Sequence, residues 1–160
     1  YAIVLVALYI SFHFIWMIGK IPSESMEPTL MVHDWTIGSR TIYKDELPKR
    51  GDIVIFYSDE EQETMVKRVI GLPGEKITFV GGHVYVNGER LDESAYLDDS
   101  VVTDPGDQDE FVVPDGCIFV LGDNREVSYD ARYWENPYIS QDKIQSDVEV
   151  VIPFHKLPWF

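Results

Sequence analysis

KITFVGGHVYVNG, residues 76–88, is the stretch that decides the fold class. Its two runs, 76–80 and 83–86, are rich in valine, isoleucine, threonine and aromatic residues, which are typical of β-strands. Gly81-Gly82 separates the runs and Asn87-Gly88 follows the second, and Asn-Gly is the strongest short signal of a two-residue hairpin turn. The stretch therefore predicts short antiparallel strands that follow one another along the chain.

Similar runs continue on both sides of this stretch. Glycine and proline separate them, as Gly51 does before one run and Pro73-Gly74 after another. No helical period of useful length occurs after residue 20. The sequence predicts a mainly β fold of antiparallel sheets or a partly open barrel. The further strand candidates are 35–39, 52–57, 64–72, 111–113, 118–121 and 148–152.

Residues 1–18 carry no charge and are apolar all round. A membrane-spanning helix needs roughly 20 such residues, within a range of about 17–25. A buried helix of a soluble domain is disfavoured because no polar face is present. A cleaved signal sequence is disfavoured because Gly19-Lys20-Ile21-Pro22 is a poor cleavage site. We expect a single-pass membrane anchor at residues 1–19, followed by one β-rich catalytic domain at residues 20–160.

The composition is that of a single acidic domain. Of the 160 residues, 45% are hydrophobic, which is enough for one core. A net charge of −15 argues against nucleic acid as a partner, because phosphates need a basic surface. Cys117 is the only cysteine, and the four histidines show no metal-ligand spacing. We expect no metal, no cofactor and no intrachain disulfide, and we expect a monomer.

Residues 92–110 carry eight acidic side chains, and no lysine or arginine occurs between Leu91 and Asn124. Clustered carboxylates suit calcium, but the spacing matches no EF-hand loop. The sequence therefore predicts a solvated, mobile loop. Tyr96 and Leu97 are the side chains expected to hold it to the body of the domain.

IPSESMEPTL, residues 21–30, places two serines between two prolines. Each proline fixes its own φ angle and favours extended backbone in the residue before it. In an extended segment Ser23 and Ser25 point to the same side. One hydroxyl could then act as a nucleophile and the other as an oxyanion donor. On spacing alone, a polar turn with two solvated serines remains the commoner meaning.

Four segments resemble, in order, the sequence boxes of bacterial type I signal peptidases. They are PSESMEPTL at 22–30, RGDIVIF at 50–56, VKRVIGLPGE at 66–75 and GDNREVSYDAR at 122–132. An apolar segment precedes them, also as in the family, and the resemblance covers nearly the whole chain. It implies a serine endopeptidase with a Ser–Lys dyad that removes signal peptides from exported preproteins. It also implies contact with membrane lipid, with the catalytic domain on the extracytoplasmic side of the cytoplasmic membrane.

A serine peptidase needs a base, and a lysine serves only if burial lowers its pKa. In a strand over 64–72, apolar side chains share a face with Lys67, and others share the opposite face with Arg68. The pattern alone leaves both residues open. The resemblance selects Lys67 as the general base, with Arg68 pointing the opposite way and staying charged. The apolar neighbours are Met65 and Val69 for Lys67, and Val66 and Ile70 for Arg68.

The resemblance also implies roles for the remaining site residues. Ser25 would be the nucleophile, and its backbone N–H would form the oxyanion hole together with the hydroxyl of Ser23, a position where many relatives have glycine. Ser128 would hydrogen-bond the Lys67 amine and orient it. Ala131 stands where relatives commonly have serine. The expected supporting residues are Asp123, Asn124 and Arg125, which would hold their loop, and Asp130 and Arg132, which would pair beside the site.

Relatives cut after small residues, with alanine typical at the first and third positions before the bond. The substrate would lie as an added strand over shallow apolar pockets. By position Ile21, Met26, Leu30 and Val66 would line these pockets, although ordinary core packing explains the same residues equally well. Two rival functions remain open: a self-cleaving, repressor-type Ser–Lys protease, and an inactive membrane-tethered β module that binds extended peptides.

Overall fold

The computed structural model describes residues 1–156. Residues 157–160, at the end of the expected catalytic domain, and the side chains of Ser11 and His155 lie outside that description. The order is α1 (Ala2–Ile15), β1 (Trp16–Lys20), the 3-10 helix η1 (Glu24–Met26), β2 (Trp35–Ser39), β3 (Ile53–Ser58), β4 (Glu63–Gly71), β5 (Lys76–Val80), β6 (His83–Val86), β7 (Glu89–Arg90), β8 (Glu110–Val112), β9 (Cys117–Leu121), β10 (Tyr138–Ser140), η2 (Gln141–Lys143), β11 (Ile144–Asp147), β12 (Val150–Ile152) and η3 (Phe154–Lys156).

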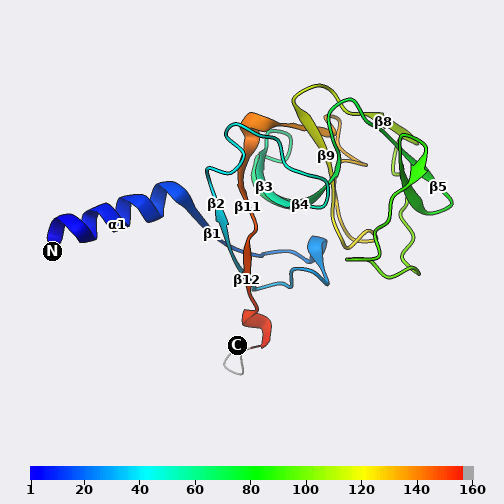
Figure 1. Ribbon diagram of the computed structural model, residues 1–160. Helices are drawn as coiled ribbons and strands as arrows, with labels where there is room; N and C mark the ends of the chain where they lie inside the picture. The colour runs from blue at the N-terminus through cyan, green and yellow to red at the C-terminus, as the bar shows by residue number, and fades with distance from the viewer. Residues whose placement is uncertain (157–160) are drawn as a thin grey trace.

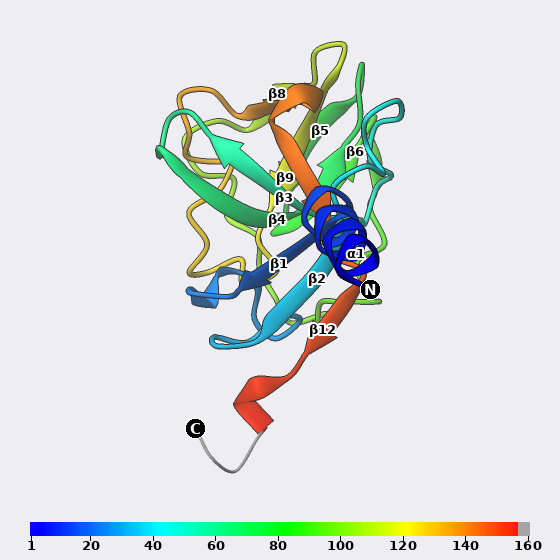
Figure 2. The ribbon, with the colours of Figure 1, turned by 90° about the vertical axis from the view of Figure 1, so that its left-hand side faces the viewer.

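The strands of the described residues form three antiparallel sheets. Their strand orders are β1-β2-β12, β10-β9-β4-β3-β11 and β7-β6-β5-β8. Figure 1 shows the first sheet beside α1, the second in the middle and the third at the end farthest from α1. Turned by 90°, Figure 2 shows β1 and β2 side by side with β12 below them. The predicted mainly β, antiparallel fold is confirmed.

The stretch at 76–88 folds as its sequence predicts. β5 pairs antiparallel with β6 through Ile77↔Val86, and β6 continues into β7 through the predicted two-residue turn. The two turn residues have positive φ angles, 52° at Asn87 and 85° at Gly88. Asparagine and glycine tolerate that conformation, which primed turns require at both central positions.

The predicted spanning segment is divided between two elements. α1 ends at Ile15, and Trp16–Lys20 forms β1, whose Ile18 lies opposite Ile37 of β2. Pairing with β2 therefore overrides the helical continuation that the apolar composition suggested. No helix within residues 1–156 has both the length and the apolarity needed to cross a membrane. All side chains of α1 that the structure describes are exposed, and α1 extends away from the sheets in Figure 1.

Two hydrophobic clusters form the interior. The larger lies between the second and third sheets and includes Phe56, Val69, Phe111, Phe119 and Ala131. Ala131, where a serine was expected from relatives, is therefore a fully buried core residue without a hydroxyl to satisfy. The smaller cluster consists of Ile21, Met26, Leu30, Ile55 and Val66.

The first and second sheets are joined where β11 runs into β12. β11 belongs to the second sheet and β12 to the first, so the chain crosses between them at Asp147. The carboxylate of Asp147 accepts from Ser39 N at 2.6 Å. A methyl group on Gly38 would overlap the backbone of Asp147, so only glycine allows this close approach.

Candidate active site

Ser25 lies in a tight turn and not in the extended segment that the prolines predicted. Ser23 is extended, with φ −132° and ψ 163°, but Ser25 is in η1. Pro22 and Pro28 restrict only themselves and the residues before them, so the residues between are free to turn. The hydroxyls nevertheless share one space, because Ser23 Oγ lies 3.3 Å from Ser25 Oγ.

Lys67 reaches this turn from β4. Its Nζ donates to Ser25 Oγ at 2.9 Å and to the carbonyl of Val66 at 3.2 Å. Only 3% of the residue is exposed. Burial lowers the pKa of Lys67 to about 8, against the opposing charges of Asp130, Glu63 and Asp123. With that pKa, about a tenth of the amine is neutral at pH 7.

Asp130 and Arg132 form the predicted ion pair beside the site. Arg132 Nε donates to one carboxylate oxygen of Asp130 at 2.8 Å, and Nη2 donates to the other at 3.0 Å. Asp130 also accepts from Gly122 N at 2.9 Å. These bonds hold the carboxylate on partners other than the Lys67 amine, as a low lysine pKa requires.

Asp123 and Asn124 connect the nucleophile turn to β4. Arg68 donates to both oxygens of Asp123, at 2.8 and 2.6 Å, and Thr29 Oγ1 donates to the same carboxylate at 2.5 Å. Asn124 N donates to the carbonyl of Ser25 at 3.1 Å. Residues far apart in the sequence thus fix the backbone that carries Ser25. Arg68 contacts different partners from Lys67, as the alternation of side chains along the strand predicted, and its pairing with Asp123 was not predicted.

Ser128 does not make its predicted hydrogen bond to Lys67. Its Oγ is buried and has no hydrogen-bond partner among the described residues. The turn that begins at Asn124 determines this, because Ser128 N donates to Asn124 O at 2.8 Å and the side chain lies against Gly122. Ser25 and the carbonyl of Val66 orient the Lys67 amine instead.

The four predicted pocket residues meet in the smaller hydrophobic cluster. Ile21 is 3% exposed and Val66 9%, whereas Met26 and Leu30 are fully buried. Ile21 and Val66 are therefore the two that come nearest to the surface, with Met26 and Leu30 packed beneath.

Two strand edges lie beside this cluster. β4 pairs with β3 from Glu63 onward but with β9 only from Arg68 onward. Residues 63–66 therefore have no neighbouring strand on the β9 side within the described part of the chain. β1 is likewise the edge strand of its sheet. An unpaired edge offers backbone N–H and C=O groups to an incoming extended peptide.

Sequence reasoning missed two residues around the site, Thr29 and Glu93, and two contacts of Arg68, with Tyr96 and with Asp123. Only the need of Arg68 for a partner could be read from the sequence, because a guanidinium between apolar neighbours in a strand must be paired. The others depend on contacts between distant segments. Arg125 likewise pairs with Glu93, 32 positions away.

Comparisons with known proteins identify the family of this chain. The family model described as signal peptidase, peptidase S26, matches residues 1–153. The chain is 42% identical over 120 residues to Probable signal peptidase I-2 of Synechocystis sp., covering 71% of this chain and 53% of that protein. It is 34% identical over 166 residues to signal peptidase IB of Staphylococcus aureus, covering 90% and 85%. The chain thus spans about half the length of the first relative.

A solved structure is similar as well. The crystal structure of a signal peptidase I from Enterococcus faecalis V583 superposes with a TM-score of 0.52 and 29% sequence identity. The match covers 64% of this chain and 97% of that one. The order of the four sequence boxes, the sheets and the family match lead to one assignment. The chain belongs to the signal peptidase family, peptidase S26.

Proposed function

We propose that this chain is a membrane-anchored serine endopeptidase that removes N-terminal signal peptides from exported preproteins. The observation that carries the proposal is the 2.9 Å separation of Lys67 Nζ from Ser25 Oγ in a buried site. Family membership and the names of the relatives support the reaction class. In this proposal residues 1–19 are the anchor and residues 20–160 the catalytic domain.

The chemistry begins with neutral Lys67. Its amine takes the proton of Ser25 as Oγ attacks the scissile carbonyl, which forms a tetrahedral intermediate. The resulting ammonium then gives this proton to the leaving amine, and an acyl-enzyme remains on Ser25. Water, deprotonated by Lys67, attacks the ester and releases the second product. Asp130 stays paired with Arg132 throughout, so that the ammonium gains no carboxylate partner.

The oxyanion would form at the start of η1. Ser25 lies in the first turn of that helix, where backbone N–H groups have no acceptor within the helix. The Ser23 hydroxyl, 3.3 Å from Ser25 Oγ, is the second donor. Losing one such donor costs roughly 10²–10³ in kcat. Ser23→Ala should therefore be slow but active, because the backbone donor remains.

The substrate would pair with the open edges of β4 and β1. Backbone hydrogen bonds would hold the segment before the scissile bond, and side chains at alternate positions would point into the domain. Ile21 and Val66 would line shallow pockets there, closed from beneath by Met26 and Leu30. Such pockets favour cleavage after small residues, with alanine at the first and third positions before the bond.

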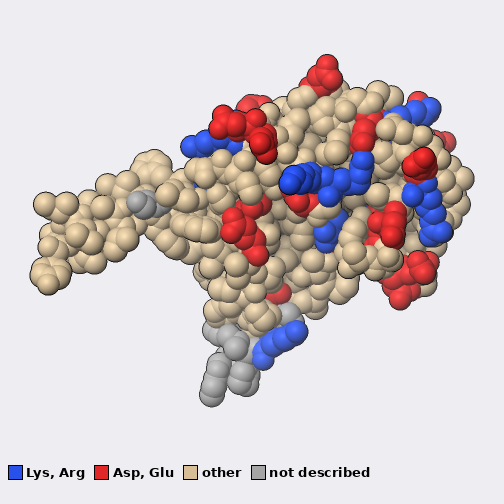
Figure 3. All heavy atoms as spheres, in the orientation of Figure 1, with Lys and Arg blue, Asp and Glu red and all other residues tan. Residues whose placement is uncertain are grey.

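We propose that residues 1–19 anchor the chain in membrane lipid as a single-pass segment, of which α1 is the helical part and is by itself too short to cross. The described side chains of α1 are exposed and almost all apolar, and Figure 3 shows no charged residue on its visible face. Only β1 and a few further residues separate α1 from Ser25, so the reaction would take place near the membrane surface. The catalytic domain would lie on the extracytoplasmic side of the cytoplasmic membrane.

The test is cleavage of a purified preprotein with an Ala-x-Ala site, with the product ends identified by mass spectrometry. We expect one cut after the second alanine, and none with Ser25→Ala, whose folding is checked by circular dichroism. If Ser25→Ala still cleaved the preprotein, the assignment of Ser25 as the nucleophile would be wrong. Binding without cleavage by the wild type would favour the inactive β module, and cleavage of its own chain alone would favour the repressor-type protease.

A further inference from the structure

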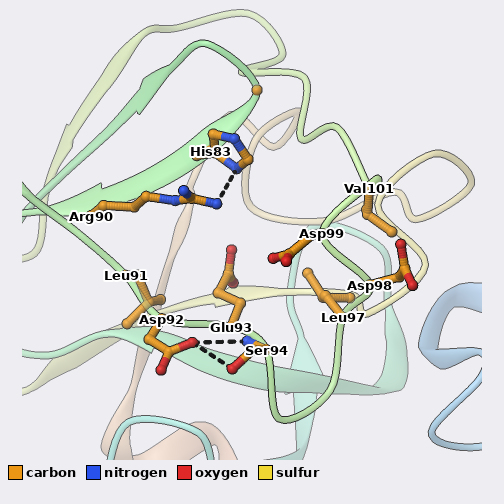
Figure 4. A pocket seen from close by; sticks show the side chains of 11 residues that line it. His83, Arg90, Leu91, Asp92, Glu93, Ser94, Leu97, Asp98, Asp99 and Val101 are labelled. Atoms are coloured by element: carbon orange, nitrogen blue, oxygen red, sulfur yellow. Dashed lines mark hydrogen bonds between the residues drawn. The ribbon is translucent and has the colours of Figure 1, made fainter.

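The segment between β7 and β8 begins as a folded loop and not as the mobile loop predicted from its acidic composition, although Asp92, Asp98 and Asp99 are exposed to solvent as predicted. Leu91 N donates to β6 and Thr103 N donates to the turn before β6, so that residues 91–103 are fixed at both ends. Asp92 accepts from the backbone and hydroxyl of Ser94, which closes a tight turn. Figure 4 shows this 91–103 loop curled around a pocket that β6 and β7 line from the other side.

The side chain of Glu93 points out of this loop and pairs with Arg125. Its carboxylate accepts from both terminal nitrogens of Arg125, at 3.2 and 2.5 Å. The Arg125 side chain is fully buried, and it also donates to Gly122 O at 3.0 Å and to Thr103 Oγ1 at 2.7 Å. A buried guanidinium is strongly destabilising without its carboxylate. Glu93 therefore holds Arg125 in the position where it bonds the backbone of Gly122.

Tyr96 leaves the same loop to meet Arg68. Its ring lies 4.0 Å from the Arg68 guanidinium carbon, and its hydroxyl donates to Glu93 at 2.8 Å. Burial and the charge of Glu93 raise the pKa of Tyr96, so that the hydroxyl stays a donor. An aromatic face attracts a guanidinium most strongly where water is excluded. Tyr96 thus covers the side of Arg68 that Asp123 does not occupy.

Both arginines act on one short segment, residues 122–125. Arg125 bonds Gly122 O, and Arg68 bonds the Asp123 carboxylate. Asn124, between them, donates to the backbone carbonyl of Ser25. The opposite side of Gly122 is equally constrained, because an added methyl group there would overlap Ser25 O and Ser128 Oγ. A shift of this segment would therefore move the nucleophile relative to Lys67.

We propose that Glu93 and Tyr96 are positioning residues of the active site, which hold residues 122–125 against the turn of Ser25. The proposal rests on the proposed peptidase function and deepens it. Neither side chain bonds Ser25 or Lys67, so each acts through an arginine. The acidic loop is then part of the catalytic apparatus, although no residue of it lies in the four sequence boxes.

If Glu93 and Tyr96 position the active site, their loss should change kcat and the pKa of Lys67. A misplacement of about 1 Å can cost on the order of 10² in rate without weakening binding. Water admitted beside Arg68 would also reduce the burial that lowers the Lys67 pKa. The charged groups that face Lys67 are Asp130, Glu63 and Asp123, and two of these are paired with Arg132 and Arg68. Loosening the Arg68 pair would raise the pKa further.

The experiment compares Glu93→Gln, Tyr96→Leu and Tyr96→Phe with Asp99→Asn, a matched change of an exposed acid in the same loop. Kinetics on the preprotein give kcat and KM, and NMR of the 13Cε-labelled lysines, assigned with Lys67→Met, gives the Lys67 midpoint without turnover. Glu93→Gln and Tyr96→Leu should lower kcat by about 10–100-fold with KM nearly unchanged, and should raise the midpoint. Tyr96→Phe keeps the ring over Arg68 and should lose less, and Asp99→Asn should match the wild type.

Folding is monitored by thermal unfolding, and all rates are compared well below the melting temperature. An unchanged kcat and an unchanged Lys67 midpoint in folded Glu93→Gln and Tyr96→Leu would overturn the proposal. A loss of activity that Tyr96→Phe and Asp99→Asn show equally would overturn it too, since the effect would then not depend on the ring. If the wild type cuts no preprotein, the proposed function fails, and the NMR midpoints alone decide the positioning role.

Discussion

The proposed role of Lys67 as a base depends on its burial and on carboxylates being kept away from its amine. Its amine meets one hydroxyl and one carbonyl, and two of the three carboxylates that act on it are bound elsewhere, Asp130 by Arg132 and Asp123 by Arg68. Desolvation then outweighs the remaining attraction, and the pKa falls from 10.5 to about 8. Two arginines are thus needed to keep one lysine free of carboxylates.

The first prediction concerns the pH dependence of cleavage. Because the proposed base is the neutral amine, kcat/KM should rise with pH through an ionisation near 8, well below the 10.5 of an ordinary lysine. Lys67→Arg should be inactive although it conserves charge, since a guanidinium does not deprotonate in proteins. The check is a pH–rate profile from pH 6 to about 10. Substantial activity of Lys67→Arg would remove Lys67 from the mechanism.

The second prediction concerns stability and needs no substrate. The unfolded chain binds the Lys67 proton up to a higher pH than the folded chain does, so stability rises with pH between about 8 and 10.5. Lys67→Met removes this group, and at pH 7 it should be more stable than the wild type by about 3 kcal/mol. Urea unfolding at several pH values measures the difference. It should shrink toward pH 10.5, and a difference that stays constant with pH would contradict the lowered pKa.

At the scale of single elements, the sequence predicted strands well where apolar residues run together and poorly elsewhere. The strand predicted at 35–39 has the bounds of β2, and the hairpin turn at Asn87-Gly88 is confirmed. β10 and β11 were missed because their short sequences, YIS and IQSD, mix polar residues with apolar ones. They are strands because β9 and β3 pair with them, and such pairing cannot be predicted from local composition.

The site was predictable only in part, for a similar reason. Ser25, Lys67 and the Asp130–Arg132 pair each lie within one of the four sequence boxes, and the structure brings them together. The orientation of Ser128 depends on the turn that begins at Asn124, and the contacts of Glu93 and Tyr96 join segments 32 and 28 positions apart. No periodicity connects residues at such separations, so only the folded chain reveals these contacts.

The third prediction concerns the junction of the first two sheets. Gly38→Ala would place a methyl group on the backbone of Asp147, where β11 passes into β12. The overlap is with main chain, which cannot rotate away, so the free energy of unfolding should fall by about 1–3 kcal/mol or more. Gly19→Ala, on the neighbouring strand, meets only side-chain atoms, Thr36 Oγ1 at 3.2 Å and Ile55 Cδ1 at 4.0 Å, and is the control. Equal stability of the two variants would contradict this account of the junction.

At the scale of the whole molecule, an uncharged helix extends from an acidic body. Figure 1 places α1 at one end and the third sheet at the other, with the site residues on elements between them. The net charge of −15 belongs to the body, since residues 1–18 carry no charged side chain. An apolar end and a strongly charged end favour different surroundings, so the proposed anchor would orient the molecule with α1 in lipid and the acidic body in water.

The fourth prediction concerns that orientation. If α1 anchors the chain with its catalytic domain outside the cytoplasm, protease added to intact spheroplasts should cut the acidic segment 92–110. The exposed residues 107–109 are the expected sites, because the 91–103 loop is held by hydrogen bonds. Fragment sizes on an immunoblot give the result, with a cytoplasmic protein as the control for intact cells. Cutting only after lysis would place the domain on the other side.

The unpaired edge of β4 has a consequence for how the protein behaves at high concentration. A strand edge that admits a passing peptide also admits the same edge of a second copy, which is how many sheets begin to aggregate. The 15 excess negative charges of each molecule oppose such encounters. Salt screens that repulsion, so high protein concentration at high ionic strength, and not a loss of folding, is the condition under which this protein would first aggregate.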